Sequence, residues 1–140
     1  MAVVVFDANV LIAFLSSEDA HHDDAVKRMR KSLEPGTRRL VCAVNYGEVL
    51  IGPLQAGGPK EADKVDAMFA RLAMETIQVD MALAQRAAAV RVRTKLKLPD
   101  AYAIATAMHA ERHLAEEVRI ESFDRRVLNA YRRLRAADPV

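Results

Sequence analysis

The chain has 140 residues, with 51% hydrophobic residues, 29% charged residues and a formal net charge of +2. A chain of this length can bury about two-thirds of its unfolded surface, and this composition excludes a disordered protein. Its single cysteine, Cys42, excludes a disulfide framework. We therefore expect a single domain over residues 1–140.

Nothing in the sequence indicates membrane insertion or export. No stretch approaches the roughly 18 apolar residues of a membrane-spanning helix. The apolar residues 3–15 are interrupted by Asp7 and Asn9, and no Lys or Arg precedes them, which argues against a signal peptide. We expect a soluble, cytoplasmic protein without a membrane partner.

Short apolar runs alternate with helical patterns along the chain. The β-branched run at residues 3–6 is continuous, which is typical of a strand buried on both faces of a parallel sheet. The last strand alternates, which favours a position nearer a sheet edge. The expected strands are residues 3–6, 40–44, 76–79 and 118–122. The expected helices are residues 10–15, 22–33, 45–50, 60–73, 81–96, 100–113 and 127–134.

Several residues mark where these helices begin and end. Gly52-Pro53 is expected to break the third helix, Pro99 to interrupt the chain before the sixth, and Asp80 to cap the fifth. Strands that alternate with helices predict an α/β sandwich around a parallel sheet. No clear fifth strand follows Asp124.

Acidic residues follow the predicted strands, and ligands of such sheets bind beyond the carboxyl ends of the strands. Asp7 directly follows the first strand, Glu48 lies in the first turn after the second, Asp100 opens a helix, and Asp124 follows the last strand. Two such charges about 4 Å apart repel by roughly 4 kcal/mol at an effective dielectric constant near 20. We therefore expect a cation, and all-oxygen ligands suit Mg²⁺ or Mn²⁺ rather than Zn²⁺.

Each acid also has a purely structural interpretation. Asp100 could complement a helix dipole, Glu48 could form a capping box with Asn45, and Asp124 could cap the last helix. Asp7 is harder to explain in this way, because an uncompensated acid at the end of a buried strand is costly. The four acids together favour a functional site.

A basic segment precedes Asp100. Between residues 81 and 99 there are five basic residues and no acid: Arg86, Arg91, Arg93, Lys95 and Lys97. Arg86, Arg93 and Lys97 share one helical face that leads toward Asp100, which makes them candidates for phosphate contacts, although a solvated helix face also explains such a run. No stretch interleaves aromatic with basic residues, so base stacking is not indicated.

Four segments resemble the motifs of PIN-domain nucleases, in the order of that family. They are VFDANVLI at residues 5–12, NYGEVL at 45–50, LPDAYAIATA at 98–107 and SFD at 122–124. The length and layout resemble the VapC toxins of bacterial toxin–antitoxin pairs. The sequence departs from the family at Asn9, where a Ser or Thr is common, and in the longer, more charged residues 109–118.

The resemblance implies a three-layer α/β/α sandwich with a short, mainly parallel central sheet. It also implies Mg²⁺-dependent hydrolysis of RNA, with Mn²⁺ as a substitute. Asp7 and Asp100 would be the principal metal ligands, and Glu48 and Asp124 would hold metal-bound waters or a second ion.

The resemblance further implies supporting residues and partners. Asn9 and Ser122 would orient the carboxylates. With RNA as the substrate, the basic face of Arg86, Arg93 and Lys97 predicts contacts between these residues and RNA phosphates. A small antitoxin would mask the site by placing Arg or Lys near the acids and by contacting the helices at residues 10–15 and 60–73. A homodimer is also implied, with apolar residues of the 60–73 helix contributing.

Other classes of protein remain as alternatives. A phosphoacceptor receiver domain needs an acidic pair near the end of the first strand and a Lys after a late strand. This chain has Asp7 alone at the first position and no such Lys. A haloacid-dehalogenase-type phosphatase needs Asp-x-Asp, where this chain has Asp7-Ala8-Asn9. A non-catalytic module with the same fold and a housekeeping PIN-domain RNA-processing nuclease without an antitoxin also remain open.

Overall fold

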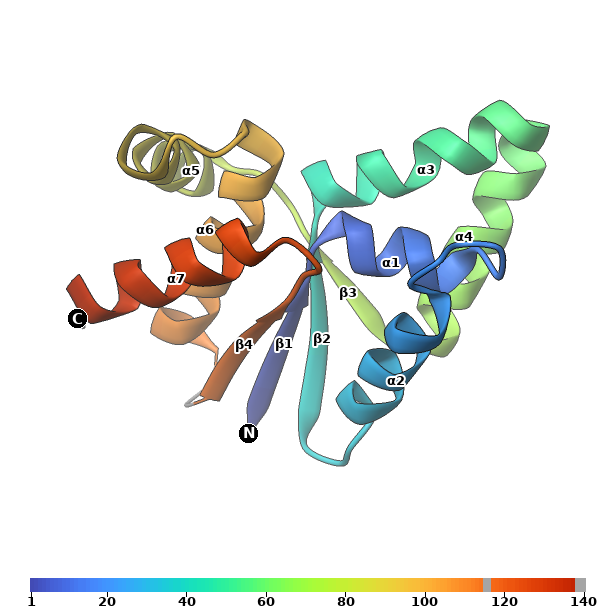
Figure 1. Ribbon diagram of the computed structural model, residues 1–140, viewed down its shortest axis with the longest axis horizontal. Helices are drawn as coiled ribbons and strands as arrows, with labels where there is room; N and C mark the ends of the chain where they lie inside the picture. The colour runs from blue at the N-terminus through green and yellow to red at the C-terminus, as the bar shows by residue number, and fades with distance from the viewer. Residues whose placement is uncertain (115–116, 138–140) are drawn as a thin grey trace.

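The computed structural model describes residues 1–114 and 117–137. Within them, four strands form one parallel sheet in the order β3-β2-β1-β4. The strands are β1 (Ala2–Phe6), β2 (Thr37–Cys42), β3 (Met74–Ile77) and β4 (Glu117–Glu121). Helices cover both faces of the sheet (Figure 1), so the predicted three-layer α/β/α sandwich is confirmed.

The central strand β1 shows why its sequence is continuously apolar. It pairs with β2 on one side and β4 on the other, and the residues from Val3 to Phe6 are fully buried. Successive side chains of a strand point to opposite faces. Val3 and Val5 therefore pack into one core cluster, while Val4 and Phe6 pack into the other.

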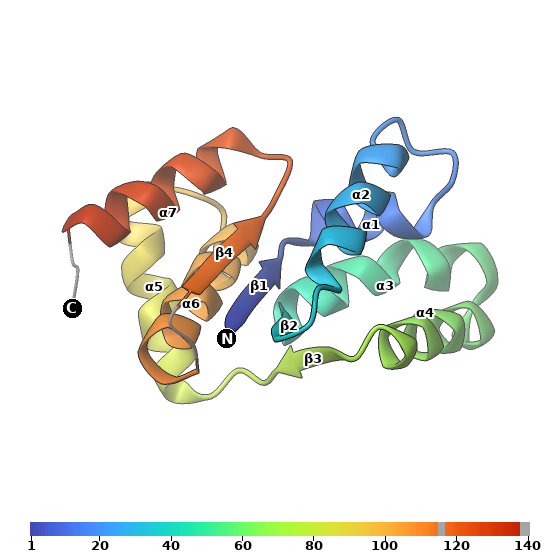
Figure 2. The same ribbon diagram turned by 90° about the horizontal axis from the view of Figure 1, so that it is seen from below.

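The described residues include seven helices, which form the two outer layers. One face of the sheet is covered by α1 (Ala8–Leu15), α2 (His22–Ser32), α3 (Ala43–Gly57) and α4 (Pro59–Arg71). The other is covered by α5 (Met81–Thr94), α6 (Leu98–His113) and α7 (Arg125–Ala137). Figure 2 shows the same two groups from below. None of the helices in the described part of the chain is long and apolar enough to cross a membrane.

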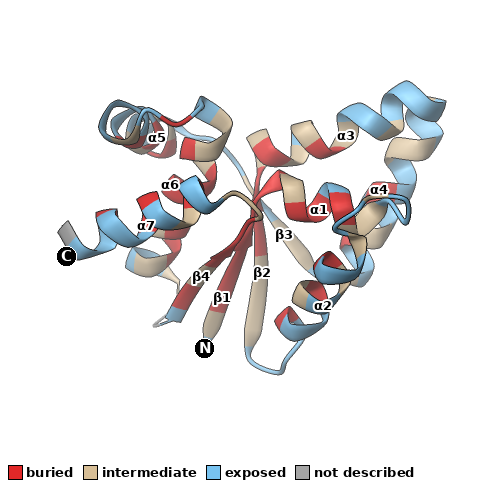
Figure 3. Cartoon of the chain, viewed as in Figure 1, coloured by how far each residue is buried: buried red, intermediate tan, exposed pale blue. Residues whose placement is uncertain are grey.

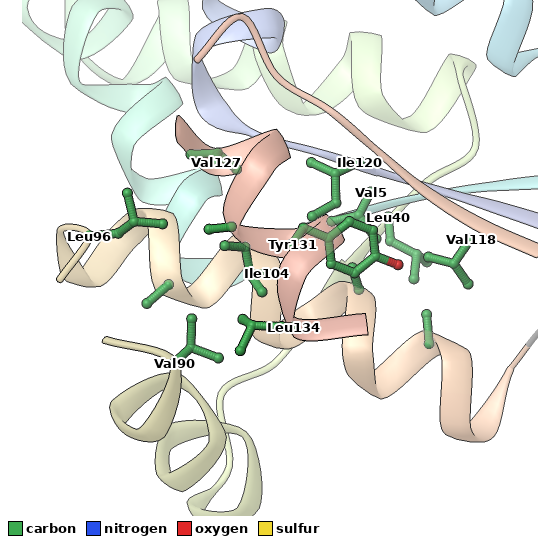
Figure 4. Packing of buried hydrophobic residues seen from close by; sticks show 14 of the residues in the cluster. Val5, Leu40, Val90, Leu96, Ile104, Val118, Ile120, Val127, Tyr131 and Leu134 are labelled. Carbon is green, nitrogen blue, oxygen red and sulfur yellow. The ribbon is translucent and has the colours of Figure 1, made fainter. Parts of the chain in front are cut away.

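Helix α6 packs closely against the sheet because its inner face consists largely of alanine. Ala101, Ala105 and Ala107 have no exposed surface, and Ile104 of the same helix is fully buried. Figure 4 shows Ile104 in the cluster that also contains Tyr131 of α7 and residues of the sheet. This packing fixes the position of the first turn of α6 relative to the strand ends.

The second strand and the helix after it differ from the prediction. The strand was expected at residues 40–44, but β2 ends at Cys42, and Val44 already lies in α3. Helix α3 also continues through Pro53 to Gly57, although Gly52-Pro53 was expected to break it. A proline inside a helix removes one backbone hydrogen bond. The carbonyl that loses its donor here is that of Val49, and the helix nevertheless continues through a segment beyond Gly52 that is mostly exposed (Figure 3).

Other helix and strand boundaries are closer to expectation. The third strand begins two residues earlier than predicted, and Pro99 lies inside the first turn of α6, where a proline is well tolerated. Asp80 caps α5 as predicted, because its Oδ1 accepts a 2.8 Å hydrogen bond from the Leu83 amide. The prediction that the fourth strand lies nearer a sheet edge is confirmed by β4.

The apolar face of α4 was expected to be free for dimer contacts. Its Val65 and Phe69 are instead buried in the same cluster as Val4 and Phe6 of the sheet. The expectation is wrong for these two side chains, because they complete the core of their own chain. These two side chains are therefore not available for dimer contacts.

Candidate active site

The parallel sheet brings the four predicted acids to the edge where the strands end. Asp7 directly follows β1, Glu48 lies on α3 after β2, Asp100 is in the first turn of α6, and Asp124 lies between β4 and α7. The charges of Asp100 and Glu48 raise the pKa of Asp7, and those of Asp124 and Glu48 raise the pKa of Asp100. The four carboxylates therefore form one electrostatically coupled group.

Asp7 is the most buried member of the group, with 3% of its surface exposed. Its Oδ1 caps α1 by accepting a 2.8 Å hydrogen bond from the Ala8 amide. Its Oδ2 accepts a 2.8 Å hydrogen bond from the Ser122 hydroxyl. Burial nevertheless raises the pKa of Asp7 to about 6, since the hydrogen bonds offset only part of the loss of hydration.

Asn9 and Ser122 join the two strand ends that carry Asp7 and Asp124. The amide nitrogen of Asn9 donates to the Ser122 hydroxyl at 3.2 Å and to Asp7 Oδ2 at 3.5 Å. The side-chain oxygen Oδ1 of Asn9 accepts a hydrogen bond from the Phe123 backbone amide at 3.1 Å. The Ser122 hydroxyl accepts one from the Asp124 backbone amide at 3.0 Å. Both side chains predicted to orient the acids thus lie in contact with the group.

Asp124 is held by its own helix. Its Oδ1 accepts a 2.9 Å hydrogen bond from the Arg126 amide at the start of α7, so the capping interpretation describes its backbone contact correctly. The Arg126 guanidinium also binds this carboxylate, at 3.0 Å from Nη2 to Oδ2, and holds the pKa of Asp124 below its usual range. The pKa of Asp100, by contrast, is raised first by burial and then by its acidic neighbours.

Asn45 links the segments that carry Glu48 and Asp100, and the sequence interpretation missed this role. The capping-box interpretation is wrong, because α3 begins at Ala43 and Asn45 lies inside its first turn. The Asn45 amide nitrogen donates to Glu48 Oε1 and to the carbonyl of Pro99, both at 3.0 Å. Asn45 is fully buried, and its Oδ1 has no hydrogen-bond partner among the residues that the structure describes. The spacing of Asn45 and Glu48 was noticed, but nothing in the sequence pointed to Pro99.

The donor set of this group fits a hard divalent cation. Its ligands would all be carboxylate oxygens, as Mg²⁺ and Mn²⁺ prefer. Burial and neighbouring negative charges both oppose the ionisation of Asp7 and Asp100. A bound cation would offset both effects by stabilising the charged carboxylates. Within residues 1–114 and 117–137, no three His, Cys, Asp or Glu side chains converge closely enough to hold an ion as they stand. Like-charge repulsion disfavours closer approach.

The predicted phosphate-contacting residues do not all lie at this group. Lys97 precedes α6, and its charge acts on Asp100. Arg86 and Arg93 lie on one side of α5, as expected, but they line a separate cavity of about 420 Å³ together with Met108. The structure brings only Lys97 of the three near the carboxylates.

The whole arrangement matches a known family of domains. The sequence model of the PIN domain matches residues 4–134, which include all four acids. The chain belongs to the PIN-domain family. No curated protein sequence matches this PIN-domain chain.

Three solved structures share the fold of this PIN domain. VapC20 of Mycobacterium tuberculosis, a toxin that cleaves the sarcin-ricin loop, has a TM-score of 0.65 and 19% identity, over 86% of this chain and 91% of that one. A toxin–antitoxin complex from Klebsiella pneumoniae has a TM-score of 0.64 and 22% identity, over 86% of each chain. VapBC2 from Rickettsia felis, bound to a DNA fragment from its promoter, has a TM-score of 0.58 and 12% identity, over 84% and 98%. At such identities the likeness shows the fold.

Proposed function

We propose that this PIN-domain protein is a ribonuclease that uses a divalent cation and acts as the cytoplasmic toxin of a toxin–antitoxin pair. The observation that carries the proposal is the coupled group of Asp7, Glu48, Asp100 and Asp124 at one edge of the sheet. Carboxylates gathered from separate elements, in surroundings that oppose their charge, suit metal-assisted phosphodiester hydrolysis. The likeness to VapC20, a toxin that cleaves the sarcin-ricin loop, supports RNA as the substrate.

Asp7 and Asp100 would hold Mg²⁺ or Mn²⁺, with Glu48 and Asp124 holding water or a second ion. A cation held there would lower the pKa of a water molecule and would neutralise charge on the scissile phosphate. Asp7 must be ionised for this role. The Ser122 hydroxyl favours ionisation, because it donates a hydrogen bond to the charged form.

The surrounding side chains would hold the acids in place while RNA binds. Asn9 and Ser122 connect the ends of β1 and β4, and Asn45 connects α3 to the start of α6. Lys97 and Arg126 add exposed positive charge beside Asp100 and Asp124, where RNA phosphates would approach.

The antitoxin would lie in an apolar groove between α1 and α3. A cavity of about 780 Å³ is lined by Ile12 and Leu15 of α1 and by Val49 and Ile51 of α3. Ile12 and Ile51 are 42% and 55% exposed, and an amphipathic partner helix would cover them. Glu48 lines the same groove, so an Arg or Lys of the partner would reach the acids from there. This proposal keeps the α1 surface expected from the sequence and replaces the 60–73 helix by α3.

RNA cleavage by the purified protein tests the proposed activity. The wild type should cleave RNA with Mg²⁺ or Mn²⁺ and not with EDTA, and Asp7→Asn and Asp100→Asn should abolish cleavage. Asp63→Asn, an exposed acid on α4, is the matched control. Cleavage that survives both active-site substitutions would contradict the proposed site.

Growth of a bacterial host tests the proposed role. The wild type expressed alone should arrest growth, Asp7→Asn should not, and co-expression of the small protein encoded next door should restore growth. Ile51→Glu should weaken this rescue, whereas Val92→Glu, at a more exposed apolar position on α5, should not. Cleavage in vitro without growth arrest would favour the housekeeping nuclease instead.

A further inference from the structure

A third cavity, of about 500 Å³, adjoins the carboxylate group on the side of α1 and α7. Asn9 and Asp124 line it, and Asn9 is hydrogen-bonded to Asp7. Its volume lies within the roughly 300–1,000 Å³ of small-molecule sites. Beyond these two residues, its wall includes His21, Phe123, Arg125 and Arg126. The cavity is therefore directly adjacent to the carboxylate group.

Two rings from distant segments stack in the wall of this cavity. The His21 and Phe123 rings lie 4.9 Å apart between centroids, with 29° between their planes. Phe123 packs against the core cluster of α1 and α2, and the Arg28 guanidinium lies over its ring, 4.8 Å from the centroid. Asp19 Oδ1 accepts a 2.8 Å hydrogen bond from the His21 amide, which holds the turn before α2. The stack is thus anchored in the core and by hydrogen bonding.

The outer member of the stack is open to solvent. His21 is exposed, whereas Phe123 is only partly exposed. An incoming flat ring would therefore meet the His21 imidazole first, with Phe123 supporting it from beneath. Aromatic side chains of this kind stack with bases of single-stranded RNA irrespective of sequence.

The same cavity carries two exposed arginines at the start of α7. Arg126 pairs with Asp124 through two guanidinium nitrogens, Nη2 at 3.0 Å and Nε at 3.3 Å. A phosphate offers the same paired oxygens as a carboxylate, so a guanidinium in this position can bind either. Arg125 adds a second guanidinium in the same wall. The cavity thus combines a surface for a base with charges for a phosphate.

We propose that this cavity is a nucleotide subsite, which binds the nucleotide next to the scissile phosphate of single-stranded RNA. The base stacks on His21, and the outer phosphate pairs with Arg125 and Arg126. The inference rests on the proposed ribonuclease function, because that function places the scissile phosphate at the neighbouring acids. Ile12 lines both this cavity and the apolar groove, and it separates a charged, aromatic surface from an apolar one. The apolar surface fits a protein helix, and the charged one fits a nucleotide.

Binding of a short, labelled single-stranded RNA tests the subsite in the Asp7→Asn background, where cleavage is silent. His21→Ala should raise the Kd about fivefold or more, the loss expected for one stacked base. His21→Phe should restore binding, because it keeps an aromatic ring. Arg125→Ala should lower the salt dependence of log Kd by about 0.7, the change expected for one phosphate contact. In the otherwise wild-type enzyme, His21→Ala should raise KM more than it lowers kcat.

Matched controls and distinct outcomes keep the two proposals separate. His113→Ala and Arg133→Ala change exposed residues elsewhere and should bind RNA like the parent. If the wild type cleaves RNA but His21→Ala and Arg125→Ala bind it unchanged, the subsite is overturned and the proposed function stands. If those variants bind RNA like the parent but no longer bind the small protein encoded next door, the cavity is a binding site for that protein and the subsite is also overturned. If the wild type neither binds nor cleaves RNA, the proposed function fails, and the subsite fails with it.

Discussion

The hydroxyl of Ser122 donates a 2.8 Å hydrogen bond to Oδ2 of Asp7, which connects the end of β4 to the most buried acid of the site. The same hydroxyl oxygen accepts hydrogen bonds from Asn9 and from the Asp124 amide. Ser122 itself is 1% exposed. A single buried hydroxyl therefore influences both the position of the acids and the charge on Asp7.

Replacing Ser122 by Ala should make Asp7 harder to ionise. The serine hydrogen bond lowers the pKa of Asp7, which burial otherwise raises to about 6, so its loss should raise that pKa further. We expect slower RNA cleavage at neutral pH and recovery at higher pH, measured as a shift of the pH–rate profile at constant Mg²⁺. Ser122→Thr keeps the hydroxyl and should shift the profile less, and the exposed Ser17→Ala is the control. An unmoved profile in Ser122→Ala would contradict this role.

In the absence of divalent cations, the Asp7 carboxyl should favour the folded state more as the pH falls from about 6 toward 3.8. Burial raises the pKa of Asp7 from 3.8 to about 6, so between these values the folded state binds a proton that the unfolded chain lacks. The contribution of Asp7 to the free energy of unfolding therefore falls as pH rises through this window, by about 3 kcal/mol in all. Urea unfolding in EDTA over a pH series measures it. The Asp7→Asn protein should lack this component, and an identical pH dependence in both proteins would argue against it.

Asn45 should be needed for full activity, although it is not one of the four acids. The Asn45 side-chain amide donates hydrogen bonds to Glu48 and to the Pro99 carbonyl. These bonds fix Glu48 relative to the turn that carries Asp100. Asn45→Ala leaves a buried carbonyl without its donor, which costs about 1–3 kcal/mol of stability. We expect a lower Tm together with reduced cleavage, read at a temperature where the variant is folded. Gln55→Ala, an exposed amide on the same helix, is the control, and full activity in folded Asn45→Ala would refute the role.

The first strand and the acids after the strands could be predicted from the sequence for a simple physical reason. The apolar run ending at Phe6 needs burial on both faces, and parallel strands end at one edge, so Asp7 and Asp124 had to lie near each other. The errors came from local rules that tertiary structure overrides. Pro53 was expected to end a helix that in fact continues beyond it.

The contacts that complete the site could not be found in this way. Asn45 meets Pro99, and His21 meets Phe123, only because the fold brings distant segments together. No periodicity or spacing within one segment encodes such pairs. The aromatic stack in particular was not expected, since the sequence has no stretch in which aromatic and basic residues alternate.

Lys97 should contribute more to RNA binding than Arg86 and Arg93. Its charge acts on Asp100, whereas the two arginines line a separate cavity. Lys97→Ala should weaken binding of single-stranded RNA and lower the salt slope by about 0.7. The Arg86→Ala/Arg93→Ala protein tests the original prediction for these residues. A larger loss in that double variant than in Lys97→Ala would show that RNA follows α5 instead.

Thermal unfolding with and without Mg²⁺ tests most directly whether the four acids form one cation site. A ligand that binds only the folded state raises the free energy of unfolding by RT ln(1 + [L]/Kd). Mg²⁺ should therefore raise the Tm of the wild type and leave the Tm of Asp7→Asn and Asp100→Asn almost unchanged. Asp63→Asn should respond like the wild type. If Mg²⁺ stabilises the wild type and Asp7→Asn equally, the carboxylate group is not the cation site and the proposed mechanism is wrong.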